Sequence, residues 1–208
     1  SLKVKTQYEH NPYPRWINLE LALDAEPISK VVSHLNIKLF DTDICKAATP
    51  NILIAGCGTG QHSISTAARF KNSKVLAVDL SLSSLAYAKR KTEEFDVMNI
   101  EYMQADILKL EKLDRRFDIV ESAGVLHHMD QPMKGWKVLV DCLNEGGLMK
   151  IGLYSELARQ SIAAMQREIN ESFISSSDAD MKSYRMKMIA SELEQHKQAK
   201  LITDFYSL

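Results

Sequence analysis

The chain has 208 residues, of which 45% are hydrophobic and 25% charged, and its formal net charge is -1 at pH 7. This length and composition indicate one globular domain with a full core. The balanced charge gives no overall electrostatic attraction to nucleic acid or to an anionic membrane. Since no apolar run approaches the ~20 residues of a membrane span, we expect neither partner.

Three cysteines lie far apart in the sequence and lack the spacing of a metal site: Cys45, Cys57 and Cys142. This pattern suits a reduced compartment better than a disulfide framework. No signal peptide is evident. We therefore expect a cytoplasmic protein without a bound metal. The start at Ser1 is compatible with a domain cut from a longer chain.

The N-terminal segment is polar, and two prolines disfavour regular structure in it. Four side chains of interest gather within residues 8–16: Tyr8, Tyr13, Arg15 and Trp16. Two interpretations are open. The segment is either a lid over a binding site or an arm that packs its aromatic side chains on the domain. Residues 18–48 are expected to be mostly helical, on an approximate apolar stripe of Leu21, Ile28, Val31, Val32, Leu35 and Leu39.

The central motif is an apolar run followed by glycines. Residues Ile52 to Ala55 predict a strand buried on both faces. Three glycines follow at alternate positions, and a helical pattern then begins, in the segment Gly56-Cys57-Gly58-Thr59-Gly60-Gln61-His62. Such a loop lets the backbone approach a ligand closely and aims helix N-terminal N–H groups at it. A plain tight turn is the alternative.

Two further strands are each followed by an acid. Residues 74–81 predict a strand, and Asp79 lies ~20 residues past the loop, where dinucleotide-type folds place the carboxylate that accepts ribose hydroxyls. A helix cap or turn acid is the alternative. Ser81 or Ser83 is expected to cap the next helix, whose pattern is Leu82, Leu85, Ala86 and Lys89. Residues 100–104 predict a third strand that leads into Ala105-Asp106-Ile107. Asp106 is either an acceptor for an exocyclic amino group such as that of adenine or a surface turn acid.

Residues 117–128 predict a fourth strand and its exit. Three small residues there would let a ligand lie close to the backbone: Ser122, Ala123 and Gly124. His127 and His128 follow directly. Adjacent side chains on a strand or loop point in different directions, which disfavours a shared metal site. His127 is a candidate general base because its pKa lies near neutrality, and a neutral histidine in a pocket wall is the alternative.

The remaining pattern predicts a helix, a fifth strand and further helices. The first helix would bury Met133, Trp136, Val140 and Leu143 and end at Asn144-Glu145-Gly146-Gly147 with a left-handed glycine cap. Residues 148–154 predict the strand, and a long amphipathic helix is expected before a linker at 175–178. The expected organisation is an arm and helical cap (1–48), an α/β core (49–174) and a C-terminal helical extension (175–208).

Strands alternate with helices across residues 52–154, which predicts a parallel sheet with helices on both faces. Over about residues 50–155 the sequence resembles the class I S-adenosylmethionine-dependent methyltransferases. The resemblance rests on five segments in order: Gly56 to Gly60, Asp79, Ala105-Asp106, Phe117 to Val120 leading to Val125-Leu126-His127-His128, and Leu143 to Gly147. It implies a three-layer Rossmann-like fold, with S-adenosylmethionine as cofactor and S-adenosylhomocysteine as product.

The resemblance also implies where the cofactor lies. The glycine loop, including Cys57, Thr59 and Gln61, would pass under the amino-acid portion, and Asp79 would hold the ribose. Leu80 and Ser81 would line the adenine, and Ala105, Asp106 and Ile107 would edge it. The methionine portion would be flanked by Ser122, Ala123 and Gly124. The lid interpretation adds Tyr13 and Arg15, with Arg15 paired to the cofactor carboxylate.

Two departures from the family pattern affect these expectations. Ile54 stands where the family often has an acid that orients the cofactor's amino group, so another group must do this or affinity is reduced. The antiparallel strand pair that usually completes the sheet is not evident after Ser177.

The expected function is methyl transfer from S-adenosylmethionine to an unidentified acceptor, a small molecule being favoured. A non-catalytic domain that binds S-adenosylmethionine or another partner is one alternative. A nicotinamide-dependent oxidoreductase is the other, but its fingerprint would place glycine where Gln61 stands.

Overall fold

A computed structural model of the chain describes residues 9–10, 12, 14–22 and 24–155. These residues lie in one compact unit, Ser1–Leu153, apart from the first two residues of a second unit, Tyr154–Leu208. The predicted long helix, the linker, the extension at 175–208 and the question of a closing strand pair all fall outside the described residues.

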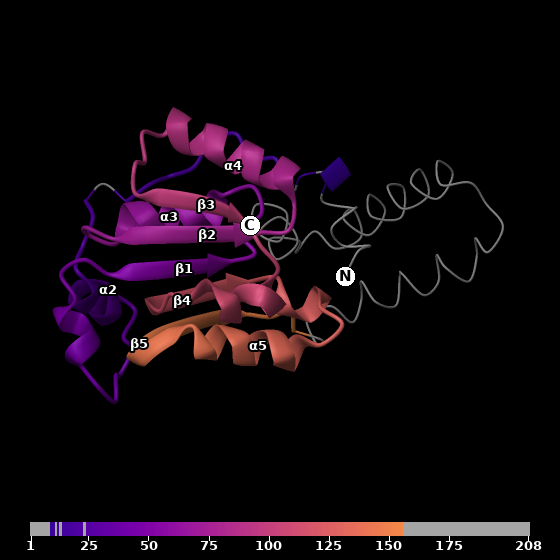
Figure 1. Ribbon diagram of the computed structural model, residues 1–208. Coiled ribbons are helices and arrows are strands. Elements are labelled where there is room, and N and C mark those ends of the chain that lie inside the picture. The colour runs from indigo at the N-terminus through magenta and orange to yellow at the C-terminus, as the bar shows by residue number, and fades with distance from the viewer. Residues whose placement is uncertain (1–8, 11, 13, 23, 156–208) are drawn as a thin grey trace, which may run out of the picture. The chain divides into compact units, whose positions relative to one another are not determined.

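Five parallel strands form a single sheet of order β3-β2-β1-β4-β5 (Figure 1). The strands are β1 (Asn51–Ala55), β2 (Lys74–Asp79), β3 (Ile100–Gln104), β4 (Phe117–Ala123) and β5 (Leu143–Gly152). The chain runs outward from β1 to β3 and then returns to the other side of β1 as β4. The point between β1 and β4 is therefore the topological switch point, where open α/β sheets bind ligands beyond the carboxyl ends of their strands.

Helices cover both faces of the sheet, as the sequence predicted. One face carries α2 (Ile28–His34), α3 (Gln61–Arg69) and α4 (Leu82–Glu94), together with the short turn η1 (Asp43–Lys46). The other face carries η2 (Ile107–Leu113), η3 (Leu126–His128) and α5 (Pro132–Asp141). The Rossmann-like three-layer prediction is confirmed.

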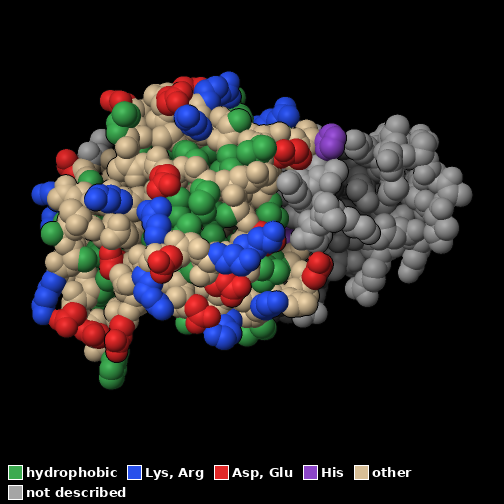
Figure 2. Space-filling model, in the orientation of Figure 1, with side chains coloured by type: hydrophobic (Ala, Val, Ile, Leu, Met, Phe, Trp, Pro, Cys, Tyr) green, Lys and Arg blue, Asp and Glu red, His purple; other side chains and the backbone are tan. Residues whose placement is uncertain are grey.

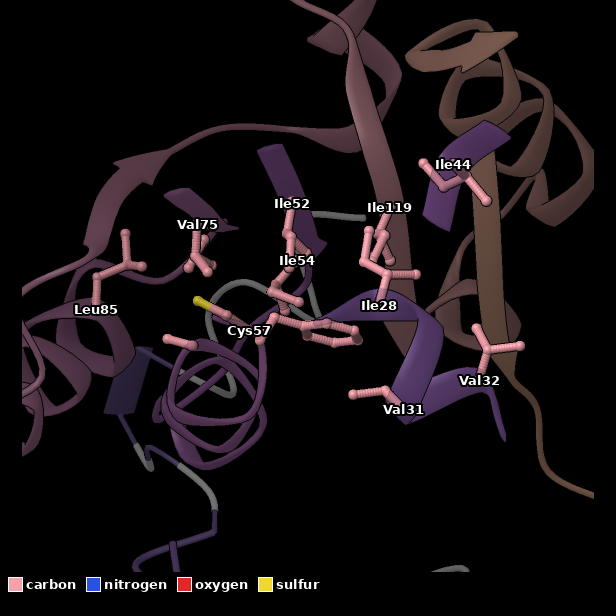
Figure 3. Packing of buried hydrophobic residues seen from close by; sticks show 13 residues of the cluster. Ile28, Val31, Val32, Ile44, Ile52, Ile54, Cys57, Val75, Leu85 and Ile119 are labelled. Carbon is pink, nitrogen blue, oxygen red and sulfur yellow. The ribbon is translucent and has the colours of Figure 1, made fainter. Parts of the chain in front are cut away.

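Strand β1 is the centre of both cores. Its residues 52–55 are fully buried, and successive side chains point to opposite faces. Ile52 and Ile54 pack with Ile119 and Val75 on the α2–α4 face (Figure 3), whereas Leu53 and Ala55 join the α5 face. A strand buried on both faces needs a continuous apolar run, which explains why this segment was easy to predict.

The face of the described part that Figure 2 shows mixes acidic and basic side chains, in keeping with the balanced net charge. None of the described helices has the length and apolar character of a membrane span.

The predicted helical stretch at 18–48 is wrong in extent. Within the described residues it contains only α2 and the short turn η1. The helix begins after Pro27, which lacks the N–H of a continuing helix, and ends just before Asn36, whose φ of +52° is left-handed. Leu35 is exposed at 58%, so the apparent stripe joined residues that do not share a face.

The helices α4 and α5 form where expected but bury different faces. On α4, Leu82, Ala86 and Lys89 are exposed, and the buried side chains are Ser84, Leu85, Ala88, Lys91 and Thr92. The buried Thr92 hydroxyl is satisfied within the helix, because its Oγ1 donates to Ala88 O at 2.8 Å. On α5, Met133 and Val140 are exposed, and the buried side is Gly135, Val138 and Leu139.

The predicted helix end at 144–147 is also wrong. Helix α5 ends at Asp141, and β5 already begins at Leu143. The strand pairing jumps from Phe117–Leu143 to Ile119–Leu148, so the asparagine and glycines form a bulge rather than a cap. Within it Gly146 has a φ of +71°, which glycine adopts without strain.

Candidate functional site

The glycine loop joins β1 to α3 at the switch point. All three glycines have positive φ: +80° at Gly56, +52° at Gly58 and +90° at Gly60. The amides of Gly56 and Cys57 both donate to Val78 O, at 2.8 and 2.9 Å. A Cβ on Gly56 would lie 2.3 Å from Val125 Cγ2. The loop therefore requires glycine both for its backbone angles and for its packing.

Asp79, at the end of β2, holds this loop in place. Its Oδ2 accepts from Gly58 N at 2.8 Å, and its Oδ1 accepts from Ser81 N at 2.9 Å. Burial raises the pKa of the Asp79 carboxyl, the backbone hydrogen bonds oppose that shift, and nearby Glu9 adds to it. Because each carboxylate oxygen can accept twice, Asp79 retains acceptor capacity for two ribose hydroxyls.

Ser81 is the N-cap of α4, so the first of the two predicted caps, Ser81 or Ser83, is confirmed. Its buried hydroxyl accepts from Ser84 N at 3.1 Å and donates to Glu9 Oε2 at 2.7 Å. The side chain is thus occupied by the helix and by the N-terminal arm. Leu80 is half-buried, and its carbonyl accepts from Gln104 Nε2 at 2.9 Å.

The N-terminal arm contacts the glycine loop. Thr59 Oγ1 donates to Pro14 O at 2.6 Å, and Trp16 Nε1 donates to Thr59 O at 3.2 Å. The Trp16 ring is buried against Tyr87 and Phe95. Trp16 is therefore an anchor, whereas Arg15 is exposed and Tyr13 lies outside the described residues. Whether the arm closes over a ligand stays a prediction.

Thr59→Val should loosen the arm. The change conserves volume but leaves Pro14 O without its donor, so the free energy of unfolding should fall by about 1–2 kcal/mol. Urea unfolding measures this loss, and hydrogen exchange at Arg15 and Trp16 should become faster. Thr59→Ser keeps the hydroxyl and should stay near wild type. Equal exchange in all three proteins would contradict the role of this hydrogen bond.

The acid after β3 caps the next turn. Asp106 Oδ1 accepts from Leu108 N at 3.0 Å at the start of η2, and Ala105 N donates to Asp79 O at 3.0 Å. Ile107 is buried in the α5-side core. These bonds place Ala105 and Asp106 beside the end of β2, and the bond from Leu108 N is the contact that a turn acid makes.

The small residues at the end of β4 divide into two roles. Ser122 is buried and donates to Ala55 O at 2.9 Å, which ties β4 to β1. Ala123 is exposed, and Gly124 has a φ of +72°, with no described atom within 4 Å of the place that a Cβ would take. Among the residues that the structure describes, the space beside Gly124 is therefore open.

The two adjacent histidines contact each other. Residues 126–128 form the 3₁₀ turn η3, and His127 Nε2 lies 3.0 Å from His128 Nε2. The expectation that their side chains diverge is wrong, because it assumed an extended backbone. Within the part of the chain that the structure describes, no group of three or more His, Cys, Asp or Glu side chains is placed to hold a metal. The general-base role of His127 stays a prediction.

A buried acid that the sequence patterns did not reveal lies beside the loop. Glu121, in β4, is only 4% exposed. Its Oε2 lies 2.6 Å from His62 Nε2 and accepts from Thr66 Oγ1 at 2.9 Å, both on α3. The available signal was an acid that directly follows the apolar pair Ile119 and Val120 within a predicted strand, but its partners lie 55 and 59 residues away in the sequence.

The charge state of Glu121 follows from these contacts. Burial alone would raise its pKa, but His62, Lys150 and Thr66 together outweigh burial and hold the pKa below its usual value. Glu121 is therefore a carboxylate at neutral pH.

Glu121 should make stability depend on pH. Because its folded-state pKa is lowered, its ionised form contributes stability above the unfolded value of about 4.5, and this is lost as pH falls through the folded pKa. Urea unfolding between pH 7 and 3 should show the difference in stability between wild type and Glu121→Gln shrinking as the pH falls. A difference that is constant with pH would contradict the lowered pKa.

The parallel sheet, the glycine loop and the acid after β2 define a nucleotide-binding α/β class of fold. Residues 52–147 match the methyltransferase domain family. An uncharacterized protein of Synechococcus sp. is 34% identical over 58% of this chain and 29% of its own length. Malonyl-(acyl-carrier protein) O-methyltransferase 1 of Ilyobacter polytropus is 29% identical over 59% of this chain and 46% of its own length.

Among solved structures, PKMT2 from Rickettsia typhi in complex with AdoHcy matches with a TM-score of 0.54 and 26% identity. The match covers 77% of this chain and 32% of that one. Residues 52–147 therefore resemble methyltransferase domains in sequence, and the fold resembles that of a methyltransferase solved with AdoHcy. It spans less than half the length of the two curated relatives and about a third of that structure.

Proposed function

We propose that the protein transfers the methyl group of S-adenosylmethionine to an acceptor. The observation that carries the proposal is the bond from Gly58 N to Asp79 Oδ2, 2.8 Å long, which joins the glycine loop to the acid after β2 at the switch point. The glycine loop would then supply backbone N–H groups to the amino-acid portion of the cofactor, and Asp79 would accept hydrogen bonds from its ribose.

The described residues fit this cofactor. Asp79 has acceptor capacity left for hydroxyls, and the space beside Gly124 suits close approach of the methionine portion. Ala105, Asp106 and Leu80 are proposed to edge the adenine. S-adenosylmethionine supplies an activated methyl group, so the protein's main task is to align acceptor, methyl carbon and sulfur.

The acceptor is proposed to be a small molecule, with His127 as the base if its reacting atom carries a proton. A cytoplasmic location is proposed from the cysteines, which are free among the described residues. The domain boundaries at 48 and 174 stay proposals as well.

A methyl-transfer screen tests the proposal. The whole chain is incubated with methyl-labelled S-adenosylmethionine and pools of amines, hydroxylated compounds and carboxylic acids, and label in the acceptor fraction is measured. Transfer above that of Asp79→Ala supports the enzyme. Tight S-adenosylmethionine binding with no transfer to any pool would favour the non-catalytic alternative.

A further inference from the structure

Glu121 combines burial with an unused acceptor. Both hydrogen bonds that the structure gives its carboxylate go to Oε2, from His62 and Thr66. Among the described residues none donates to Oε1, although the residue is only 4% exposed. Because this oxygen is not fully enclosed by the protein, it keeps open acceptor positions that a donor from outside can reach. Such an atom is a candidate contact for a ligand.

The position of Glu121 favours a ligand at the switch point. It lies on β4, next to β1, in register with Ile54 on one side and Lys150 on the other. His62 comes from the first turn of α3, directly after the glycine loop. The carboxylate is thus held between the end of β4 and the beginning of α3. Gly124, beside which the described residues leave open space, follows three positions further along the chain.

The charge of the site selects the kind of ligand group. His62 and Lys150 both lower the pKa of Glu121, so the carboxylate is ionised at neutral pH. An ionised oxygen with a vacant lone pair in low dielectric favours a cationic donor. S-adenosylmethionine has such a donor, the α-ammonium group, at its amino-acid end. Ile54, in register with Glu121, stands where an acid was expected for that group.

We propose that Glu121 Oε1 accepts a hydrogen bond from the cofactor's α-ammonium group, with His62 and Thr66 as positioning residues that hold Oε2. The acid is thereby moved from β1 to the neighbouring strand β4 at the same register. This inference rests on the proposed function.

Binding of two ligands tests the assignment. S-adenosylhomocysteine carries the ammonium group, and its deaminated analogue has hydrogen in that place. Glu121→Gln should weaken S-adenosylhomocysteine binding by about 10- to 100-fold, the usual size for one charge-assisted hydrogen bond. Binding of the deaminated analogue should change less than about threefold, because the missing contact does not exist for it.

Glu101→Gln is the matched control. It makes the same change at an exposed acid of β3 that pairs with Arg115, so both ligands should bind within about threefold of wild type. If Glu121→Gln fails to fold, as judged by circular dichroism, Glu121→Asp gives the same comparison, since it keeps the charge and withdraws the oxygen by one carbon. It should also weaken only the ligand that carries the ammonium group.

Three results would overturn the assignment. Equal weakening of both ligands would make Glu121 a structural residue only. Unchanged binding of S-adenosylhomocysteine to Glu121→Gln would show that Glu121 does not contact the ammonium group. Weaker binding of S-adenosylmethionine alone would place the carboxylate near the sulfonium instead. If wild type binds neither S-adenosylmethionine nor S-adenosylhomocysteine, the proposed function itself fails, and that outcome is distinct from the other three.

Discussion

Replacing Gly60 with alanine is expected to lower the free energy of unfolding by about 2–5 kcal/mol. Gly60 has a φ of +90°, which strains any other residue, and a Cβ there would lie 2.6 Å from Ala88 Cβ and 3.0 Å from Ala88 Cα. The contacted atoms belong to the buried side of α4 and cannot rotate away. The helix start at α3 would therefore be pushed off α4. Urea unfolding without ligand measures the loss.

Gly124→Ala is the matched control for that experiment. Gly124 also has a positive φ, +72°, but no described atom lies within 4 Å of the added Cβ. The free energy of unfolding of Gly124→Ala should therefore fall only by the cost of backbone strain, about 1–2 kcal/mol. If both variants lose the same free energy, the contact with Ala88 carries no cost and the close packing of loop and α4 is wrong.

Replacing Asp79 with alanine is expected to weaken S-adenosylmethionine binding by about 1–3 kcal/mol, the usual range for lost charge-assisted hydrogen bonds. Two effects combine in this variant. The ribose loses its acceptor, and Gly58 N and Ser81 N lose the carboxylate that fixes the loop. Isothermal titration of the folded variant measures the change.

Asp79→Asn separates these two effects. Its amide oxygen still accepts from one backbone N–H, so the loop is partly held, but the charge and one acceptor are gone. We expect binding between that of wild type and Asp79→Ala. If Asp79→Ala binds S-adenosylmethionine as wild type does, Asp79 is only a turn acid.

The strands and the glycine loop could be predicted because their signals are local. Residues 52–55 are buried on both faces, so the apolar run needs no knowledge of partners. The faces of α4 and α5 could not be predicted in this way. The buried side of α4 contains Ser84, Ala88 and Thr92, and the Thr92 hydroxyl lies 2.8 Å from the hydroxyl of Tyr102, a partner on β3 that only the tertiary structure reveals.

The candidate site was predicted in part. Asp79 lies at the end of its strand as expected, but the sequence did not reveal that its two oxygens also hold Gly58 and Ser81. Glu121 was missed because its role depends on contact with His62, 59 residues away in the sequence, and on the register of β4 against β1. Hydropathy patterns carry neither kind of information.

Calorimetric titration of the whole chain with S-adenosylhomocysteine, and in parallel with NAD, tests the central claim most directly. We predict saturable one-site binding of S-adenosylhomocysteine, weakened in Asp79→Ala, and no comparable binding of NAD, since Gln61 stands where the dinucleotide fingerprint has glycine. Binding of NAD in preference to S-adenosylhomocysteine, or no binding of S-adenosylhomocysteine to the folded protein, would contradict it.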